Sequence, residues 1–167
     1  MVFTITIIFM TSKLEKNFED NFAFIWIKFL EFEIKRSCEA IKLAGGARRY
    51  LVLQIICWHN LLIVSSSLNK NQRQEIVEHW HNLSKKGYDD AKILTYSLIS
   101  KLSGLSVETV RRHVKKLIKD KWVTYTKKTG VVFSASEENN KKLTDDFNVK
   151  ETQMFKELIM RINSLDN

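Results

Sequence analysis

Residues 95–133, TYSLISKLSGLSVETVRRHVKKLIKDKWVTYTKKTGVVF, decide the fold of this chain. A short apolar run ends at Gly104, where the chain can reverse without a Cβ clash. Ser106 follows, and its hydroxyl can cap a second helix by accepting a hydrogen bond from the next turn. The small side chains of Ser100 and Ser103 would let the two helices approach closely. This order of elements predicts a helix-turn-helix.

The second of these helices is amphipathic. Its apolar side chains Val110, Val114 and Leu117 recur at i, i+4 and i+7 and form one stripe. The opposite side carries four charged residues, Glu108, Arg112, Lys115 and Lys119. One face is therefore expected to pack and the other to face outward, as a helix that enters the major groove of DNA requires.

Two β-prone runs follow this helix, at residues 122–126 and 131–133. They are joined by Lys127, Lys128, Thr129 and Gly130, and this glycine can supply the positive φ that a tight turn needs. The pattern predicts a β-hairpin with a basic tip. Basic residues at such a tip suit contact with phosphate.

In the run SGLSVETVRRHVKKLIKDKWV and the tip KKTG, the chain resembles the winged-helix transcriptional regulators of bacteria, in the broad MarR-like or GntR-like sense. The resemblance covers roughly a third of the chain and does not single out one family. It implies that the helix from Ser106 recognises DNA and that Lys127 and Lys128 clamp the DNA backbone.

The N-terminal half of a recognition helix enters the groove most deeply. We therefore expect base edges or adjacent phosphates to be met by Ser106, Glu108, Thr109 and Arg112. The residues expected mainly to neutralise phosphate are Arg111, Lys115, Lys116, Lys127 and Lys128.

Two further side chains of this helix allow alternatives. Glu108 either accepts from a cytosine amino group or holds Arg112 at i+4, and the second is the commoner outcome. His113 sits between the apolar stripe and the basic face. A histidine buried at this edge is the simpler expectation, and a phosphate contact in its charged form is the alternative.

The positive charge is concentrated in one segment. From Lys101 to Lys128, nine Lys and Arg accompany two acidic residues, so this segment holds seven of the eight net positive charges. The rest of the chain is nearly neutral. A local basic patch of this kind predicts a nucleic-acid partner, here double-stranded DNA, whereas a surface evenly covered with lysine would spread the charge.

Glycines and apolar periodicity divide the remainder of the chain. The expected fold is mainly α, with an N-terminal helical region over residues 1–66, a winged helix-turn-helix over 70–135, and a C-terminal helix within 136–167 that Ser136 caps. The N-terminal region should hold one helix from about residue 14 to Gly45-Gly46 and another over residues 47–65, followed by a linker. A helix over residues 71–86, with Ile76, Trp80 and Leu83 on one face, suits the first helix of a winged-helix core.

The first helix carries two apolar stripes. One stripe contains Leu14, Phe18, Phe22, Ile25, Phe29 and Phe32. The other contains Trp26, Leu30, Ile34, Cys38 and Ile41. Because a solvent-facing helix needs only one stripe, we expect a homodimer joined mainly through residues 14–64, with a thick monomeric helical core as the alternative.

The sequence contains no catalytic motif, and its candidate metal ligands are badly spaced. Cys57 and His59, like His79 and His81, stand at i and i+2, about 200° apart on a helix, so neither pair can chelate from one face. We expect no metal, no cofactor and no enzymatic activity. The aromatic residues of the first helix suit a core better than a ligand pocket, and a small-molecule effector stays unknown.

The compartment is inferred from the two cysteines and the N-terminal end. Cys38 and Cys57 are too few for a disulfide scaffold and are expected to be reduced core thiols in the cytoplasm. Residues 1–10 are apolar but too short for a membrane span and lack a basic leader. Residues 1–9 therefore precede an alternative start at Met10 or form an edge strand, and no membrane association is expected.

The residues and the resemblance lead to one expectation: a bacterial, homodimeric, sequence-specific regulator of transcription that binds double-stranded DNA. Three alternatives share parts of the pattern. A winged helix can serve as a protein-interaction module, and a replication-initiation protein would use the same DNA-binding elements. The third is an enzyme or small-molecule carrier built on the aromatic N-terminal helices.

Overall fold

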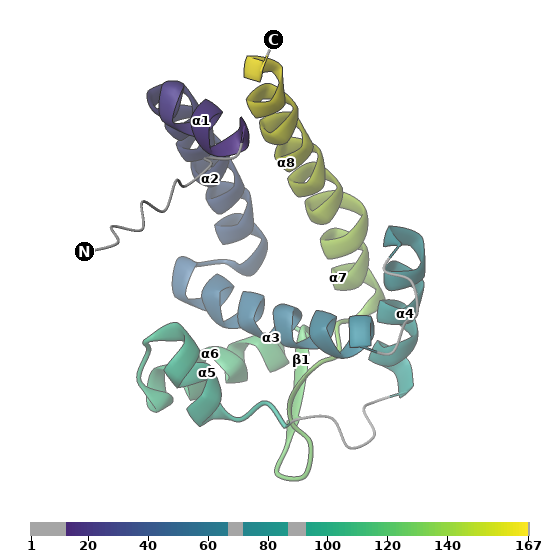
Figure 1. The fold of residues 1–167 in the computed structure, drawn as a ribbon. Helices are drawn as coiled ribbons and strands as arrows, with labels where there is room; N and C mark the ends of the chain where they lie inside the picture. Colours follow the sequence, from purple (N-terminus) through teal and green to yellow (C-terminus); the bar gives the residue numbers. More distant parts are fainter. Residues whose placement is uncertain (1–12, 67–71, 87–92, 167) are drawn as a thin grey trace, which may run out of the picture. The chain divides into compact units, whose positions relative to one another are not determined.

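The computed structural model describes residues 13–66, 72–86 and 93–166, in two compact units (Figure 1). One unit comprises residues 37–150 and the other residues 1–36 together with 151–167. The division falls inside two long helices, α2 (Phe22–Ala44) and α8 (Asn148–Asn163). The expectations for residues 1–9 and for the linker after residue 66 fall outside the described residues.

Unit 37–150 is built on three helices and a β-hairpin. The helices are α3 (Ala47–Ser66), α5 (Tyr96–Ser103) and α6 (Val107–Lys119), and the hairpin strands are β1 (Val123–Thr126) and β2 (Gly130–Phe133). α3 lies across α5 and α6 and also contacts β2 (Figure 1). The predicted mainly α fold with a helix-turn-helix, a hairpin wing and a C-terminal helix is confirmed.

Local sequence explains both ends of the turn between α5 and α6. Thr95 caps α5 by accepting from the Leu98 N–H, and Gly104 ends that helix in the left-handed conformation at φ 69°. Ser106 caps α6 by accepting from the Thr109 N–H at 3.2 Å. The two helices therefore begin and end where the capping residues predict.

The turn is also held by its serines. The Ser100 hydroxyl donates to the Leu105 carbonyl at 2.6 Å. The Ser103 hydroxyl donates to the Ile99 carbonyl at 2.7 Å and accepts from the Leu105 N–H at 3.2 Å. The two serines thus satisfy backbone groups that the reversal leaves without helical partners.

The apolar stripe of α6 forms the centre of the core. Val110, Val114 and Leu117 are completely buried, in the same cluster as Ile99 of α5 and Val52 of α3. The opposite side of α6 is exposed, as its periodicity predicts. The register of the recognition-helix candidate is therefore fixed by packing against α3 and α5.

α6 ends in a left-handed residue that is not glycine. Lys121 has φ 58°, and the following Trp122 N–H donates to the Leu117 carbonyl at 2.9 Å. This is the hydrogen-bond pattern of a Schellman motif, in which glycine usually occupies the left-handed position. The Asn139 side chain adds to the cap by donating to the Asp120 carbonyl at 2.7 Å.

Replacing Lys121 with glycine is expected to raise the free energy of unfolding by about 0.5–1 kcal/mol, because glycine adopts the left-handed conformation without Cβ strain. Urea denaturation would measure this change. The same replacement at Lys119, inside α6, should lower the free energy of unfolding by about 0.5–1 kcal/mol. A Lys121→Gly variant less stable than the wild type would contradict the described helix end.

The hairpin is antiparallel and is anchored beside α5. Val123 pairs with Phe133 and Thr126 with Gly130, within one residue of the predicted strand limits. Gly130 has φ 67°, and a Cβ there would lie 2.6 Å from the Leu94 carbonyl oxygen. That carbonyl accepts from the Val131 N–H at 2.9 Å. Gly130 is therefore required both by backbone conformation and by the close approach of the chain before α5.

One expectation about this core is wrong. The helix predicted over residues 71–86 is α4 (Arg73–Lys86), but α3, rather than α4, is the first helix of the three-helix core. α3 places buried side chains along its length, including Val52, Ile56 and Val64, so its apolar surface is used inside this unit. The predicted boundary between residues 66 and 70 therefore separates α3 from the domain to which it belongs.

α4 instead covers the edge of the hairpin. The Trp80 ring lies 4.7 Å from the Phe133 ring, and its Nε1–H donates to Asn140 Oδ1 at 3.1 Å. Asn140 belongs to α7 (Glu137–Lys141), which Ser136 caps as predicted. A π-helical segment, η1 (Lys142–Phe147), connects α7 to α8, and the chain continues into a short 3-10 segment, η2 (Ser164–Asp166).

The second unit contains α1 (Lys13–Asp20), the first part of α2, and most of α8. The single helix expected from residue 14 is interrupted at Asn21, whose side-chain amide donates to Asn17 Oδ1 at 2.8 Å. The Phe32 and Phe155 rings of α2 and α8 lie 5.8 Å apart. Among the described apolar residues of this unit, Ile25 and Leu158 alone are buried.

One of the two cysteines differs from the environment expected for it. Neither cysteine is in a disulfide, but Cys38 is exposed and is therefore not the core thiol that its apolar surroundings predicted. Within the described ranges, no helix has both the length and the apolar character that crossing a membrane requires.

Candidate nucleic-acid interface

The outward face of α6 presents a continuous row of cations. The exposed members are Arg111, Arg112, Lys115, Lys116 and Lys119. They stand opposite the completely buried stripe, so packing of that stripe determines where their side chains point. This face can therefore meet an extended polyanion.

Both acidic residues of the basic segment are engaged by arginines. The Arg111 guanidinium donates to Glu108 at 2.7 Å, and Arg49 of α3 donates to Asp120 at 2.7 Å. The expectation that Glu108 holds Arg112 is wrong, because Glu108 pairs at i+3 rather than i+4. Among the described residues, no ion-pair partner competes for Arg112, Lys115 or Lys116.

Ser106 and Thr109 lie together at the beginning of α6. The Ser106 hydroxyl donates to Thr109 Oγ1 at 2.9 Å while it caps the helix. Ser106 is exposed and Thr109 half-buried. The two hydroxyls mark the end of α6 that a groove would admit first.

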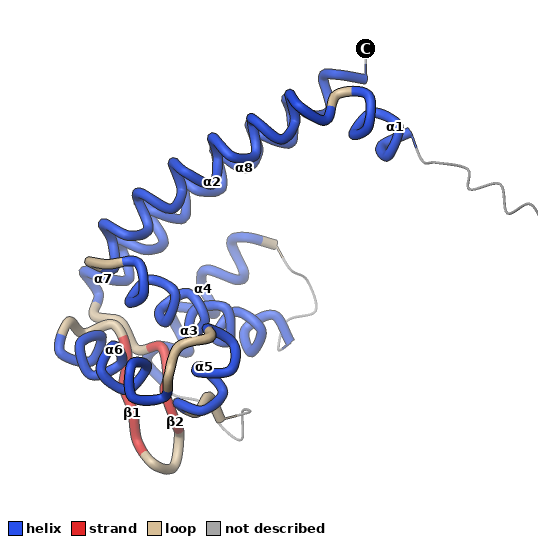
Figure 2. Tube along the Cα trace, turned by 90° about the vertical axis from the view of Figure 1, so that its left-hand side faces the viewer, coloured by secondary structure: helices blue, strands red, loops and turns tan. Residues whose placement is uncertain are grey.

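The hairpin tip carries the two predicted lysines. Lys127 and Lys128 are both exposed in the turn between β1 and β2, and the tip extends beyond the helices of its unit (Figure 2). Thr126 and Thr129 hold the turn, since the Thr129 N–H donates to Thr126 Oγ1 at 2.9 Å. The lysines therefore occupy a turn of defined geometry.

A pair of tyrosines, which sequence analysis did not single out, links α6 to the hairpin. The Tyr96 ring of α5 stacks on the Tyr125 ring of β1 at 4.6 Å, and the Arg111 guanidinium lies 6.0 Å from the Tyr96 ring. Burial and the neighbouring Tyr125 raise the pKa of Tyr96, against the opposing effect of Arg111, so its hydroxyl stays a donor. The stack brings the basic helix and the hairpin onto one connected surface.

His113 lies where α6 faces the beginning of α3. Both ring nitrogens are buried and have no hydrogen-bond partner among the residues that the structure describes. Burial lowers the pKa of His113 first, and the cations of Arg112, Lys116, Arg49 and Arg48 lower it further. The structure therefore favours a neutral histidine at the packing edge, and it adds Arg48 and Arg49 to the cations around α6.

His113 should make the chain less stable in mild acid. Its pKa is lowered on folding, so below the unfolded pKa of 6.5 the unfolded state binds a proton that the folded state does not. The free energy of unfolding should therefore fall as pH falls through this range, by less than about 1.4 kcal/mol per pH unit for one proton. Urea denaturation between pH 7.5 and 5.5 would measure the dependence.

A His113→Gln variant should show a flatter dependence of stability on pH over the same range. His79→Gln in α4 is the matched control for the loss of an imidazole side chain. Equal slopes for wild type and His113→Gln would show that this histidine is not the group that titrates.

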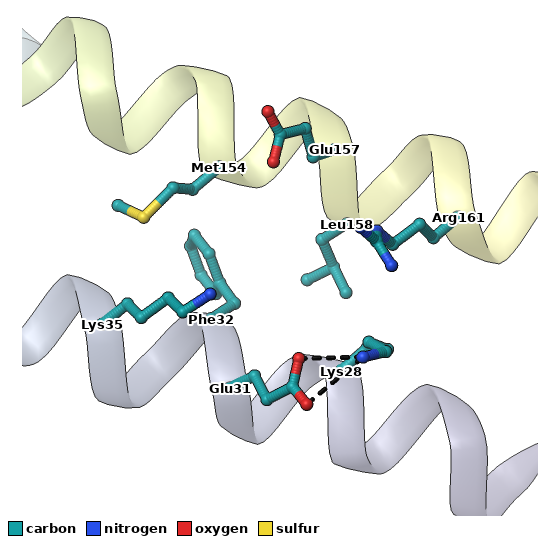
Figure 3. A pocket seen from close by; sticks show the side chains of 8 residues that line it. All are labelled: Lys28, Glu31, Phe32, Lys35, Met154, Glu157, Leu158 and Arg161. Carbon is teal, nitrogen blue, oxygen red and sulfur yellow. Dashed lines mark hydrogen bonds and ion pairs between the residues drawn. The ribbon is translucent and has the colours of Figure 1, made fainter.

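A separate small cavity lies in the other unit, between α2 and α8 (Figure 3). Its volume is about 100 Å³, and its apolar lining comes from Phe32, Met154 and Leu158. Ligand pockets usually have volumes of about 300–1,000 Å³, so this cavity is small for an effector. Among the described residues, no group of three or more His, Cys, Asp or Glu could hold a metal ion.

Comparison with known families agrees with the geometry of unit 37–150. Residues 88–124 match the family model described as Winged helix-turn-helix DNA-binding. The matched segment contains α5, α6 and the beginning of β1, which carry the cap residues and the basic face. This segment is thus similar to known DNA-binding domains of the winged helix-turn-helix type. No curated protein and no solved structure matches the chain.

Proposed function

We propose that the chain is a transcriptional regulator that binds a specific sequence of double-stranded DNA. α6 is the recognition helix in the major groove, and the hairpin is a wing on the DNA backbone. The observation that supports this proposal best is the row of exposed cations on α6, in which Arg111 alone has an acidic partner among the described residues, together with Lys127 and Lys128 at the wing tip. A winged helix that only bound protein would not need this charge.

Specificity and affinity are assigned to different residues. The residues proposed to meet base edges or adjacent phosphates are Ser106, Glu108, Thr109 and Arg112. Those proposed to neutralise phosphate are Arg111, Lys115, Lys116, Lys127 and Lys128. Tyr96 and Tyr125 join the surface between them and can donate hydroxyl hydrogen bonds to the backbone.

The proposal includes a homodimer that acts in the cytoplasm without enzymatic activity. Its support is the second unit, where Phe22, Trp26, Ile34 and Phe155 expose large apolar surface while few described side chains are buried. Large exposed apolar areas often mark an interface between proteins. Two copies of the winged helix would favour an inverted-repeat site with half-sites about 10 base pairs apart.

Selection of bound fragments from a random duplex library tests the proposed function. Enrichment of one motif, arranged as two half-sites, is the expected result. Binding without any enriched motif would replace the regulator with an architectural protein. No binding would favour a winged helix used as a protein-interaction module.

Removing both wing lysines should weaken binding to all duplexes alike. Each phosphate that the wing no longer neutralises should reduce the slope of log K against log salt concentration by about 0.9. The Lys127→Ala, Lys128→Ala variant is therefore expected to show a smaller slope and the same selected motif. Fluorescence anisotropy at several salt concentrations would measure it.

The matched control removes two exposed lysines from outside the basic face, by Lys42→Ala and Lys150→Ala. This control changes the net charge equally and should keep the salt slope of the wild type. An unchanged slope for the wing variant would rule out phosphate binding by the wing.

A further inference from the structure

α2 carries a regular apolar seam on one of its faces. Residues of this seam recur with alternating spacings of four and three: Ala23, Ile27, Leu30, Ile34, Ser37 and Ile41. In a heptad lettered a to g, isoleucine occupies every a position, at 27, 34 and 41, and the d positions hold Ala23, Leu30 and Ser37. No charged residue lies in the seam over this length.

Over residues 22–36, the seam lies opposite the side of α2 that packs inside its own unit. Ile25 is buried, and Phe32 packs against Phe155 of α8. These two residues stand about half a turn around the helix from Ile27 and Ile34. α8 therefore does not cover the seam, and the large seam residues Ile27, Leu30, Ile34 and Ile41 are exposed.

The exposed area is large enough for a dimer interface. Trp26, at the edge of the seam, and its four large residues are 38–63% exposed. With about 200 Å² for each side chain, they present on the order of 500 Å² of apolar surface. Two copies facing each other would bury about 1,000 Å², which is near the lower limit for a specific interface.

We propose that the seam of α2 pairs with α2 of a second copy as a parallel two-stranded coiled coil. Among parallel coiled coils, isoleucine at a with leucine at d favours two strands, and Leu30 is the leucine at d in this seam. The flanking charges agree. In an antiparallel pair with full overlap, Glu31 at position e would face Glu31 of the second copy, and Glu33 at position g would face Glu33 of the second copy. These like charges would repel each other. In the parallel pair Glu33 faces Cys38, and Glu31 faces Trp26.

The inference rests on the homodimer proposed above and assigns its interface, but it does not depend on DNA binding. It also reduces the predicted dimer interface, residues 14–64, to one face of α2. The buried side chains of α3 belong to the winged-helix core, and Ile25 belongs to the interior of its own unit. Three residues of the second stripe predicted for the first helix, Leu30, Ile34 and Ile41, belong to the seam assigned to the partner copy.

Sedimentation equilibrium of the full chain tests the seam. The wild type should have the mass of two chains of 19.6 kDa. Ile27→Asp with Ile34→Asp should raise the dimer dissociation constant at least 100-fold, because two carboxylates would enter each seam. Lys35→Asp, on another face of α2, is the control and should leave the mass unchanged. Circular dichroism of each variant checks that α2 remains helical.

Two outcomes of this experiment distinguish the homodimer from its proposed interface. A monomeric wild type would overturn the homodimer together with the seam. A dimeric wild type whose mass the two aspartates do not change would overturn the seam alone and leave another dimer surface. Binding of either variant to the selected DNA half-site is measured separately, so failure of the proposed function is recognised independently.

A cysteine at a d position tests the parallel arrangement without destabilising the seam. The variant carries Ser37→Cys in a chain where Cys38 and Cys57 are replaced by serine. Its new thiol lies opposite the same thiol of the second copy only if the two helices are parallel and in register. Mild oxidation should then produce a covalent dimer, and the chain without the new cysteine should not cross-link. Cross-linking that instead requires cysteines at both Ile27 and Ser37 would show antiparallel helices and overturn the proposal.

Discussion

Arg112→Ala should weaken binding to the selected DNA site by about 5- to 150-fold, which corresponds to about 1–3 kcal/mol. Arg112 is exposed on the outward face of α6, and no ion pair is described for it, whereas the adjacent Arg111 is engaged by Glu108. The preference for one base over the others should weaken at one position of the site. Anisotropy titrations against the selected site and its single-base variants would measure both effects.

The control for this prediction is Lys42→Ala in α2, which removes one exposed cation outside the basic face. It should keep the affinity and the base preference of the wild type. If Arg112→Ala keeps both as well, then the outward face of α6 is not the surface that reads DNA.

Leu117→Ala should lower the free energy of unfolding by about 2–5 kcal/mol. Leu117 is completely buried in the core of the winged helix, where truncation leaves a cavity, and its carbonyl also accepts from Trp122 at the end of α6. Urea denaturation followed by circular dichroism would measure the change.

The adjacent Ile118 provides a matched control on the same helix. Because 38% of Ile118 is exposed, Ile118→Ala should cost well under half as much as Leu117→Ala. A larger destabilisation at Ile118 than at Leu117 would mean that α6 is rotated and that its basic residues do not share the outward face.

The features predicted from the sequence are those that neighbouring residues determine. The hydroxyl of Ser106, the glycine at 104 and the stripe from Val110 to Leu117 each act within a few residues. Capping, turn chemistry and helical periodicity therefore predict α5, α6 and the hairpin closely.

The role of α3 could not be predicted in the same way. Apolar residues occur around much of this helix, so periodicity does not show which face enters which core. Trp58 and Leu61 are exposed while Val52 and Ile56 are buried, and only the tertiary structure distinguishes them. The predicted domain boundary after residue 66 is wrong for this reason.

Two side-chain contacts of the candidate interface were also missed. Tyr96 and Tyr125 stand on different elements, and nothing near either residue predicts that their rings stack. The pairing of Glu108 with Arg111 rather than Arg112 depends on rotamers that i+3 and i+4 spacings both allow. The tyrosine stack follows from how α5 packs against the hairpin, and the ion pair follows from side-chain rotamers within α6.

The most direct test of DNA recognition is an anisotropy titration of the full chain with its selected duplex, carried out at several salt concentrations beside the same strand in single-stranded form. We expect tighter binding to the duplex and a log–log salt slope of about −4 or steeper, because five or more phosphates should be neutralised. A chain that binds neither form at low salt, or binds both equally, would contradict recognition of double-stranded DNA by this winged helix.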